Sequence, residues 1–234
     1  MWLTAPNLQS THGFSTRNSQ NLSVRVGDDL ETVLENRKRA LEALKLVPKR
    51  TMLVKQTHSG DVLRVTPELL EDSGKLEADA MVSSDSLALA IETADCYPIL
   101  LEDRVAGVIG AAHAGWRGTV AGIARNTLEA MIELGADPTR VRAAIGPGIC
   151  AKNYEVSPDL RDRFLEANFP KHIWSRENQN WHVDLAEANR WLLKHSGVPR
   201  ESIWVSGACS TEAQFFSYRR DAGVTGRMWA VIAQ

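Results

Sequence analysis

The chain has 234 residues, a formal net charge of −2 and 44% hydrophobic residues, enough to build an extensive core. Its 27 lysines and arginines are dispersed along the sequence, which argues against a nucleic-acid-binding surface. The N-terminus lacks the pattern of a secretory signal, and no apolar run approaches the roughly 18 residues of a membrane span. We therefore expect a soluble cytoplasmic protein that acts on small molecules, without nucleic-acid or membrane partners.

The motifs described below recur from residue 13 to residue 227 without an intervening linker, low-complexity tract or repeat. This continuity predicts one domain spanning residues 1–234. The three cysteines are odd in number and widely spaced, so we expect no disulfide framework and a reducing compartment. Cys150 and Cys209 are then expected to have structural roles, while Cys96 remains available as a thiolate.

The first predicted element is a helix that begins at Asp28 or Asp29 and ends near Leu44, with apolar residues on one face. Apolar runs then predict strands over residues 52–55, 62–65, 78–82, 87–91, 99–101 and 105–111. The polar residues 102–104 separate the last two runs and predict a hairpin turn.

The second half of the chain begins with a predicted helix over 119–134, which ends at Gly135 as a C′ residue. Ser157 followed by proline, and Asp184, are typical N-caps and predict two further helices. Strands are predicted over residues 141–145, 203–205 and 228–233. Strands cluster in the middle of the chain and helices are interspersed, which favours an α+β fold with mixed sheets.

Cys96 and His113 stand at the outer ends of the two strands of the predicted hairpin, so the hairpin returns them to the same edge. His58 follows another apolar run and precedes a Ser-Gly break. One thiolate and two imidazoles are a ligand set for zinc or copper, and three protein ligands leave one position open for chemistry. The alternatives are a buried, inert Cys96 and surface-loop histidines. The polar break around Cys96 and the small residues beside His113 favour a functional site.

Nine short motifs are distributed throughout the chain. The motifs are GFSTR at 13–17, KQTHSGDV at 55–62, ADAMVSS at 78–84, TADCYPILLED at 93–103, AAHAGWRG at 111–118, IGPGI at 145–149, YEV at 154–156, FFSYRRD at 215–221 and TGR at 225–227. These motifs resemble those of the laccase-domain family, whose members have also been called polyphenol oxidase, peptidoglycan editing factor and purine nucleoside phosphorylase. They occur in order through nearly the whole chain, which makes the resemblance specific.

The resemblance implies helices packed outside two stacked mixed sheets, in α/β/β/α layers. It also implies a zinc site at His58, Cys96 and His113, which would be the catalytic residues. The implied reaction is phosphorolysis of adenosine, inosine, guanosine and methylthioadenosine, with an accompanying adenosine deaminase activity.

The phosphate required for phosphorolysis needs an anion-binding group. Arg17 is the first candidate because its guanidinium fork suits phosphate oxygens; Arg219, Arg220, Arg227 and the amides after His113 are the others. Gln56 is a candidate to bind a base or a ribose hydroxyl, or to orient a metal ligand.

The remaining side chains near the motifs carry weaker expectations. Trp116 offers a face for a purine, although packing is the more common role for such a ring. The other histidines are expected to be non-catalytic: His12, His172, His182 and His195.

Two other functions compete with the zinc-dependent phosphorylase. In the first, Cys96 is a nucleophile and His113 its base, which gives a metal-free amide hydrolase able to edit peptidoglycan precursors, with His58 unexplained. In the second, the His-Cys-His set binds copper for phenol oxidation. True laccase activity is disfavoured because six histidines without an H-x-H pair do not furnish the cluster that reduces oxygen. A purely structural metal would need a fourth protein ligand, for which Asp95 is the neighbouring candidate.

Overall fold

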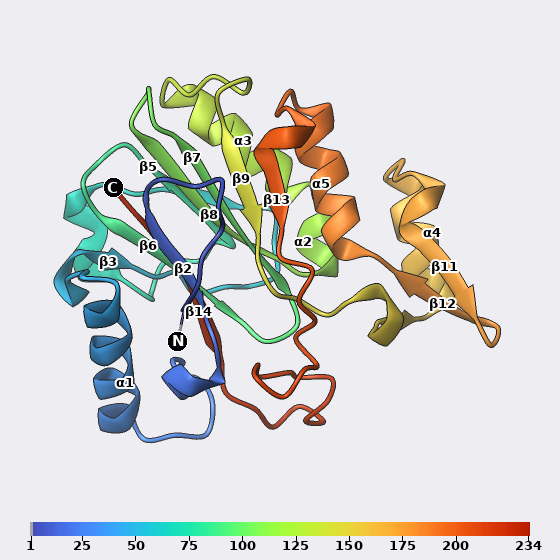
Figure 1. Ribbon diagram of the computed structural model, residues 1–234, viewed down its shortest axis with the longest axis horizontal. Coiled ribbons are helices and arrows are strands. Elements are labelled where there is room, and N and C mark those ends of the chain that lie inside the picture. Colours follow the sequence, from blue (N-terminus) through green and yellow to red (C-terminus); the bar gives the residue numbers. More distant parts are fainter. Residues whose placement is uncertain (1) are drawn as a thin grey trace.

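The computed structural model describes residues 2–234, which form three β-sheets and five α-helices (Figure 1). The five-stranded sheet has the order β1 (Trp2–Leu3), β2 (Thr11–Ser15), β14 (Met228–Ala233), β6 (Ala88–Thr93), β3 (Thr51–Met52). The six-stranded sheet has the order β13 (Ile203–Val205), β9 (Arg142–Ile145), β7 (Tyr97–Asp103), β8 (Val108–Ala114), β5 (Ala80–Ser83), β4 (Val62–Arg64). The three-stranded sheet has the order β10 (Glu155–Val156), β12 (Asn180–Val183), β11 (Trp174–Glu177). The helices are α1 (Leu30–Ala43), α2 (Trp116–Val120), α3 (Ile123–Glu133), α4 (Pro158–Glu166) and α5 (Leu185–His195).

The two larger sheets pack face to face between helices. One apolar cluster fills the space between the sheets and contains Leu100 of β7 and Ile232 of β14. A second cluster joins α1 to the outer face of the five-stranded sheet, and a third joins α3 and α5 to the outer face of the six-stranded sheet. These layers confirm the predicted α+β fold with mixed sheets and the α/β/β/α order.

Strands with both faces buried explain why apolar runs were a good guide to the sheets. In β14, Ala230 and Ile232 contribute to the cluster between the sheets, whereas Trp229 and Val231 contribute to the cluster under α1. A strand buried on both faces is apolar at successive positions rather than at alternating ones. Each predicted strand is present, with boundaries shifted by no more than three residues.

The helix starts follow from local capping. Asp29, Ser157 and Asp184 each occupy an N-cap position, and their side chains accept hydrogen bonds from Thr32, Leu160 and Glu187 backbone amides. Such caps satisfy amides that have no partner within the helix. The three corresponding predicted helices are confirmed.

The helix predicted over 119–134 is interrupted. The chain first turns into α2, which begins at Trp116, and then into α3 from Ile123. Gly122 between them has a φ of 80°, in the left-handed region that ends a helix. The prediction of one continuous helix was therefore wrong, although Gly135 ends α3 with a φ of 99° as expected of a C′ glycine.

The hairpin turn lies later than predicted, because β7 continues through Asp103 and the turn falls between β7 and β8. Glu102 accepts the backbone amides of Gln9 and Ser10 at 2.8 Å each, and both Glu102 and Asp103 are 1% exposed. Partners distant in sequence thus allow two carboxylates to occupy buried strand positions, where their polarity alone suggested a turn.

Several short strands carry no clear sequence signal and were not predicted. They are β1, β2 and the three strands of the smaller sheet. β2 is rich in small and polar residues, yet it lies between β1 and β14 and four of its five residues are buried. Figure 1 shows α4, β11 and β12 projecting from the layered body.

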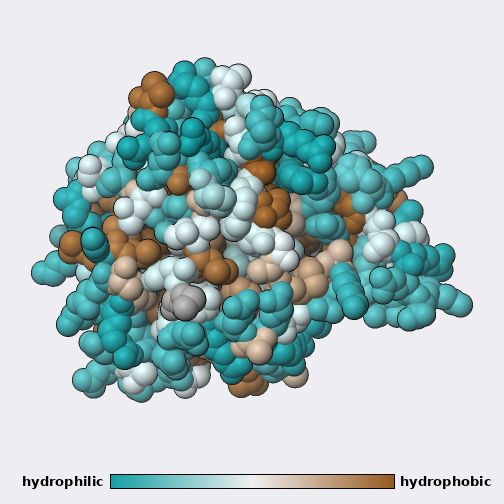
Figure 2. Space-filling model, in the orientation of Figure 1, coloured by the Kyte–Doolittle hydropathy of each residue, from teal (hydrophilic) through white to brown (hydrophobic). Residues whose placement is uncertain are grey.

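The described residues include no helix long and apolar enough to cross a membrane. The face in Figure 2 is largely hydrophilic, with apolar residues distributed in small separate areas. Single exposed apolar side chains of this kind are normal on a protein surface.

Candidate functional site

Three side chains with metal-donor atoms meet at one end of the β7–β8 hairpin. Cys96 directly precedes β7, His113 lies in β8 opposite Pro98, and His58 lies in the loop between β3 and β4. Their donor atoms all lie within 4.8 Å of one another, and the two imidazole centroids are 4.9 Å apart. The structure therefore brings together the three residues that the sequence singled out.

Gly115 allows these donors to approach the backbone after β8. A Cβ atom at this position would lie 2.8 Å from the Cys96 Sγ and 3.3 Å from the His58 Cδ2. The first distance is shorter than van der Waals contact, so any side chain at this position would displace the Cys96 or His58 side chain. Gly115 thus leaves room for the donors to pack against the backbone.

Asp79 orients His113 from behind. The carboxylate is fully buried just before β5, and its Oδ1 lies 2.8 Å from the Nδ1 of His113. Burial alone would raise the pKa of Asp79, but hydrogen bonds from the His113 ring and the Ser59 and Thr57 amides lower that pKa well below its usual range. Asp79 is therefore ionised at neutral pH and holds the His113 ring with its Nε2 directed away from the carboxylate.

The electrostatics of the cluster favour a thiolate at Cys96. Burial raises the pKa of a thiol, but the charge on His113 and hydrogen bonds from His113 and His58 together lower the pKa of Cys96 below its usual value. A thiolate is the form of cysteine that binds metals and acts as a nucleophile. The donor set is therefore suited to zinc or copper in its chemistry as well as in its geometry.

A cavity of about 610 Å³ surrounds the cluster. Its walls combine aromatic rings with basic side chains, which suit a ligand that has a flat ring and an anionic group. Besides the three donors, these lining residues are Trp116, Tyr154, Tyr218, Arg25, Arg117, Arg219 and Arg227.

Only some of the predicted anion-binding arginines lie in the cavity around the three donors. Arg219 and Arg227 line this cavity, whereas Arg17 lines an adjacent cavity and lies 5.1 Å from the centroid of the Phe216 ring. The two cavities meet at Val26. Arg220 is paired with Asp221 at 2.7 Å and lines neither of them.

Gln56 and Trp116 both line the cavity around the donors. The side-chain amide of Gln56 donates to the Glu92 carbonyl at 2.8 Å and accepts from the Glu92 amide at 2.8 Å, which fixes the segment before His58 to β6. The Trp116 ring packs against the apolar core and lies 4.4 Å from the Arg117 guanidinium. Trp116 thus has a packing role and also presents part of its surface to the cavity.

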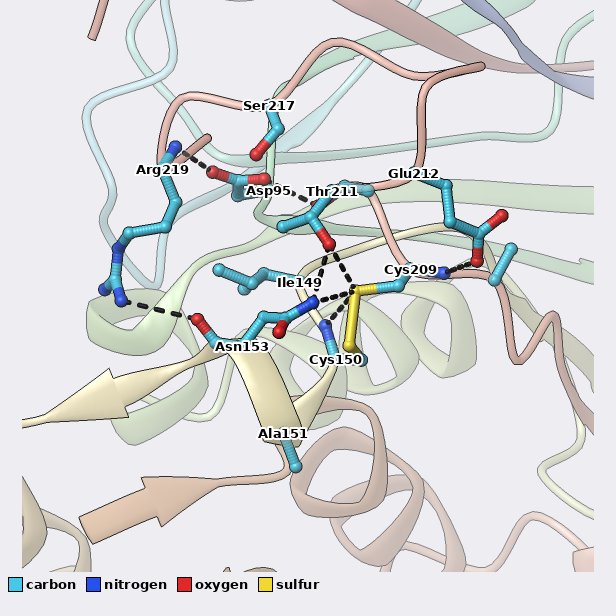
Figure 3. The surroundings of a disulfide bond; sticks show 12 residues. Asp95, Ile149, Cys150, Ala151, Asn153, Cys209, Thr211, Glu212, Ser217 and Arg219 are labelled. Atoms are coloured by element: carbon cyan, nitrogen blue, oxygen red, sulfur yellow. Dashed lines mark hydrogen bonds between the residues drawn. A yellow bond between two sulfur atoms is a disulfide. The ribbon is translucent and has the colours of Figure 1, made fainter. Parts of the chain in front are cut away.

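A disulfide joins two segments of the cavity wall (Figure 3). Cys150 and Cys209 are 59 residues apart in sequence, and the fold brings their Cα atoms to 5.0 Å. The expectation that the cysteines form no disulfide was therefore wrong. The two cysteines approach each other because residues 148 and 209 pair in parallel in the folded chain, and their spacing in the sequence does not reveal this pairing. The linked segments carry Tyr154 and Arg219, so the disulfide braces the cavity.

The carboxylate of Asp95 binds the same wall and does not complete the donor set. Ser210 donates to one carboxylate oxygen at 2.6 Å, and the Arg219 backbone amide donates to the other at 2.6 Å (Figure 3). Asp95 has a φ of 86°, an uncommon conformation that these contacts hold in place. Within residues 2–234, the cluster therefore consists of three donors.

The other four histidines make hydrogen bonds elsewhere in residues 2–234. Their partners are Ala5 and Ser10 for His12, Glu187 for His172, Ala151 for His182 and Trp191 for His195.

Sequence reasoning missed Asp79, Arg117 and Tyr154 as parts of the site. Asp79 lies in a motif that the sequence analysis quoted, and its usable signal was a single charged residue between Ala78 and a buried apolar strand. Arg117 and Tyr154 also lie in motifs given above, AAHAGWRG and YEV, but their residue types carried no further signal because arginines and tyrosines are common on exposed helix starts and loops.

An α/β/β/α fold with a His-Cys-His cluster in a basic, aromatic cavity defines a class of protein whose donor atoms could hold a metal ion beside a small polar ligand. A sequence profile of the family described as multi-copper polyphenol oxidoreductase laccase matches residues 8–234, and the chain belongs to this family.

Relatives show which activities are named within the family. A protein named purine nucleoside phosphorylase from Deinococcus radiodurans is 48% identical, covering 98% of this chain and 91% of that protein. A protein named adenosine deaminase RL5, from an unknown prokaryotic organism, is 34% identical, covering 97% of this chain and 95% of that protein. The crystal structure of YlmD from Geobacillus stearothermophilus matches with a TM-score of 0.92 at 33% identity, covering 100% of this chain and 96% of that chain. The resemblance drawn from the motifs is confirmed.

Proposed function

We propose that this protein is a zinc-dependent purine nucleoside phosphorylase that acts on adenosine, inosine, guanosine and methylthioadenosine, and that it also deaminates adenosine. The observation that carries the proposal is the His58, Cys96 and His113 cluster inside a cavity lined by arginines and aromatic rings. The names of relatives with up to 48% identity support purine nucleosides as the substrate class.

Zinc fits the donor atoms. Two imidazoles and one thiolate are typical zinc ligands, and three protein donors are the number found in catalytic zinc sites. Bound there, zinc would supply a Lewis acid beside the reacting groups of the substrate. Asp79 supplies the carboxylate partner that zinc-binding histidines usually have.

The cavity residues supply binding and orientation. Tyr154 and Trp116 present aromatic surface on which a purine can stack. Burial and the nearby Cys96 charge raise the pKa of Tyr154 to about 12, so its phenol is protonated at neutral pH and is available as a hydrogen-bond donor. This donor suits a purine nitrogen or a ribose oxygen.

The arginines that line the cavity are the best candidates to bind phosphate. Arg219 donates to the backbone carbonyls of Asn153 and Glu155, whereas Arg117 contacts the Trp116 ring through its guanidinium. Arg117 therefore keeps its forked donors for an anion and is the first choice for the phosphate-binding residue. Arg17, in the adjacent cavity, is the matched control.

A phosphate-dependent nucleoside assay on protein purified without added metal, paired with metal analysis, tests the proposal. We expect bound zinc, and we expect Cys96→Ala to lose zinc and nucleoside cleavage together. Arg117→Lys should reduce phosphorolysis more than deamination, because deamination uses water rather than phosphate, and Arg17→Lys should affect phosphorolysis less. Full zinc occupancy in an inactive Cys96→Ala variant would contradict the metal-ligand role of Cys96.

A specific observation favours a second candidate, the cysteine-dependent amide hydrolase that edits peptidoglycan precursors. Cys96, His113 and Asp79 form a thiol, imidazole and carboxylate series, in which a nucleophile, a base and an orienting group follow one another. His58 distinguishes the two candidate functions, because a hydrolase that uses Cys96, His113 and Asp79 does not need it. Amide hydrolysis that survives His58→Gln would support the hydrolase, whereas loss of metal and of nucleoside cleavage in that variant would support the phosphorylase.

Copper remains the alternative metal, but the family description alone points to phenol oxidation. Within residues 2–234, the His-Cys-His cluster is the one group of at least three His, Cys, Asp or Glu side chains that can hold a metal. A multicopper oxidase needs a further histidine-rich cluster to reduce oxygen. The donor inventory therefore supports zinc chemistry over oxygen reduction.

A further inference from the structure

A single carboxylate contacts both segments that carry imidazole donors. Asp79 Oδ1 lies 2.8 Å from His113 Nδ1. Asp79 Oδ2 accepts the backbone amides of Thr57 at 3.0 Å and Ser59 at 2.6 Å, the two residues that flank His58. The side-chain hydroxyls of Thr57 and Ser59 also reach this oxygen, at 3.3 and 3.1 Å. One oxygen of Asp79 thus contacts His113, and the other contacts the residues on both sides of His58.

The contact to residues 57–59 matters because His58 has an uncommon backbone conformation. Its φ is 62°, in the left-handed region that residues with a side chain seldom occupy. Such a conformation persists only where surrounding contacts determine it. Two amides that converge on one buried carboxylate oxygen, one from each side of His58, are contacts of this kind.

The contact to His113 fixes which ring nitrogen can bind a metal. A carboxylate accepts but does not donate when ionised, so the Nδ1 of His113 carries the proton that it shares with Asp79. Nε2 is therefore the ring nitrogen of His113 whose lone pair a metal can bind, once any proton on it has been released. The backbone carbonyl of Asp79 also accepts the His113 amide at 2.7 Å, which joins the two residues through the main chain.

We infer that Asp79 is the positioning residue of the whole donor set: one oxygen sets the tautomer and orientation of His113, and the other holds the turn that presents His58. The metal-binding consequence rests on the proposed function, whereas the positioning itself does not. Asp79 would affect metal binding only through the two histidines, because it is not one of the three donors.

Asp79→Asn is the test variant, since it keeps the size of the side chain. An amide has one oxygen and one donor group, so it cannot accept from His113 on one side and from two backbone amides on the other. Asp103→Asn is the matched control, because Asp103 is also a buried carboxylate that accepts several backbone amides but lies at the opposite end of the hairpin.

The first measurement is titration of metal-depleted full-length protein with Co²⁺, followed by the thiolate-to-cobalt absorption. Loss of a carboxylate partner typically weakens metal binding about 10–100-fold, and we expect that range for Asp79→Asn. Asp103→Asn should bind Co²⁺ with wild-type affinity even though it unfolds more easily. Wild-type affinity in a folded Asp79→Asn protein would overturn the inference.

The second measurement needs no metal. Nitrogen NMR of histidine-labelled protein should show a protonated His113 Nδ1 bonded to the carboxylate and a single His58 environment, and Asp79→Asn should lose both features. Unchanged ring signals in Asp79→Asn would overturn the positioning role. Absence of a cobalt spectrum in the wild-type protein would instead contradict the metal proposal, so the two failures are distinguishable.

A milder variant covers the case in which Asp79→Asn does not fold. Thr57→Val combined with Ser59→Ala removes the two hydroxyl contacts to Asp79 and leaves its contact to His113. We expect altered His58 signals with an unchanged His113 tautomer, and a smaller loss of Co²⁺ affinity. An altered His113 ring with an unchanged His58 would contradict the assignment of one oxygen to each donor.

Discussion

Each end of the β7–β8 hairpin contains a buried carboxylate whose charge is compensated by hydrogen bonds, but the two carboxylates hold different groups in place. At the end near Cys96 and His113, the buried Asp79 accepts an imidazole and two loop amides. At the turn end, the buried Asp103 accepts the amides of Val105, Ala106 and Asp137 and pairs with Arg140 at 3.0 Å. In both cases hydrogen bonds compensate for the burial of a charge.

The difference lies in what the carboxylate holds. The partners of Asp103 are backbone amides and an arginine, so this end fixes the turn and the start of β9. One partner of Asp79 is an imidazole that also faces a thiol and a cavity. A buried carboxylate therefore indicates a functional site when its partners include a side chain with reactive or metal-binding atoms, and a structural role when they do not.

The largest effect should come from Gly115→Ala at the donor end. Gly115 has a φ of −76°, which any residue adopts, so the only obstacle is the 2.8 Å approach of the new Cβ to the Cys96 Sγ. A displacement of this kind at a reacting group costs about 100-fold in rate or more. We expect nucleoside cleavage and zinc content to fall together, as measured by steady-state assay and metal analysis.

Stability provides the control for Gly115→Ala. Urea unfolding should show a small change compared with the loss of activity, because the clash can be relieved by moving the His58 and Cys96 side chains. Retained activity with retained zinc would show that the donors tolerate displacement, and the close packing at Gly115 would then be incidental.

The second effect concerns the disulfide that braces the cavity wall. Cys150→Ser combined with Cys209→Ser removes a cross-link between residues 59 apart, which should lower the free energy of unfolding by about 4 kcal/mol. Because the linked segments carry Ile149, Tyr154 and Arg219, the KM for the nucleoside should rise as well.

Denaturant unfolding with and without reducing agent measures the stability part of this prediction. The wild-type protein in reducing agent should behave like the double variant. Equal stability of wild-type and double-variant proteins under oxidising conditions would show that the cross-link does not stabilise the fold in solution.

The sequence was informative where the cause of a structure is local. Asp29, Ser157 and Asp184 cap helices through residues three positions ahead, and continuous apolar runs mark strands buried on both faces. The sequence was misleading where the cause is distant. Glu102 occupies a buried strand position because its partners lie 92 and 93 residues away, so a local reading of its charge predicted a turn.

The same division applies to the candidate site. Cys96 and His113 could be brought together by a hairpin that the local pattern predicted, and His58 was included for its residue type and its place after an apolar run, with the family resemblance in support. Asp79 was missed because its role depends on His113, 34 residues away, and on the loop around His58. The disulfide was missed for the same reason, since its cysteines approach only in the folded chain.

The third effect is the pH-dependent contribution of Asp103 at the turn end. Burial alone would raise the pKa of Asp103, but hydrogen bonds from Asp137, Arg140 and the turn amides lower that pKa below its usual value. A group whose pKa is lower in the folded state stabilises the fold above its unfolded pKa, roughly 3.9, and this contribution is lost as the pH falls through the folded pKa.

Asp103→Asn should therefore lower the free energy of unfolding by about 2 kcal/mol at pH 7, since one amide replaces a carboxylate with several donors. The difference between wild-type and variant proteins should shrink below about pH 4. Urea unfolding at several pH values measures both. A difference that stays constant down to pH 3 would show that the charge of Asp103 does not cause its contribution.

The smallest effect should come from Gly107→Ala, the counterpart of Gly115→Ala at the turn end. Gly107 has a φ of 62°, and the nearest atom to a new Cβ is the flexible Gln234 side-chain nitrogen at 2.9 Å. Here the backbone conformation is the obstacle, which should lower the free energy of unfolding by about 1 kcal/mol without changing activity or zinc content. Gly107→Asn should recover part of this loss, because asparagine tolerates the left-handed region better than alanine. Urea unfolding and the nucleoside assay together test the pair: if Gly107→Ala reduced activity while the stability stayed constant, the two ends of the hairpin would be coupled, and the turn would have to be counted as part of the site.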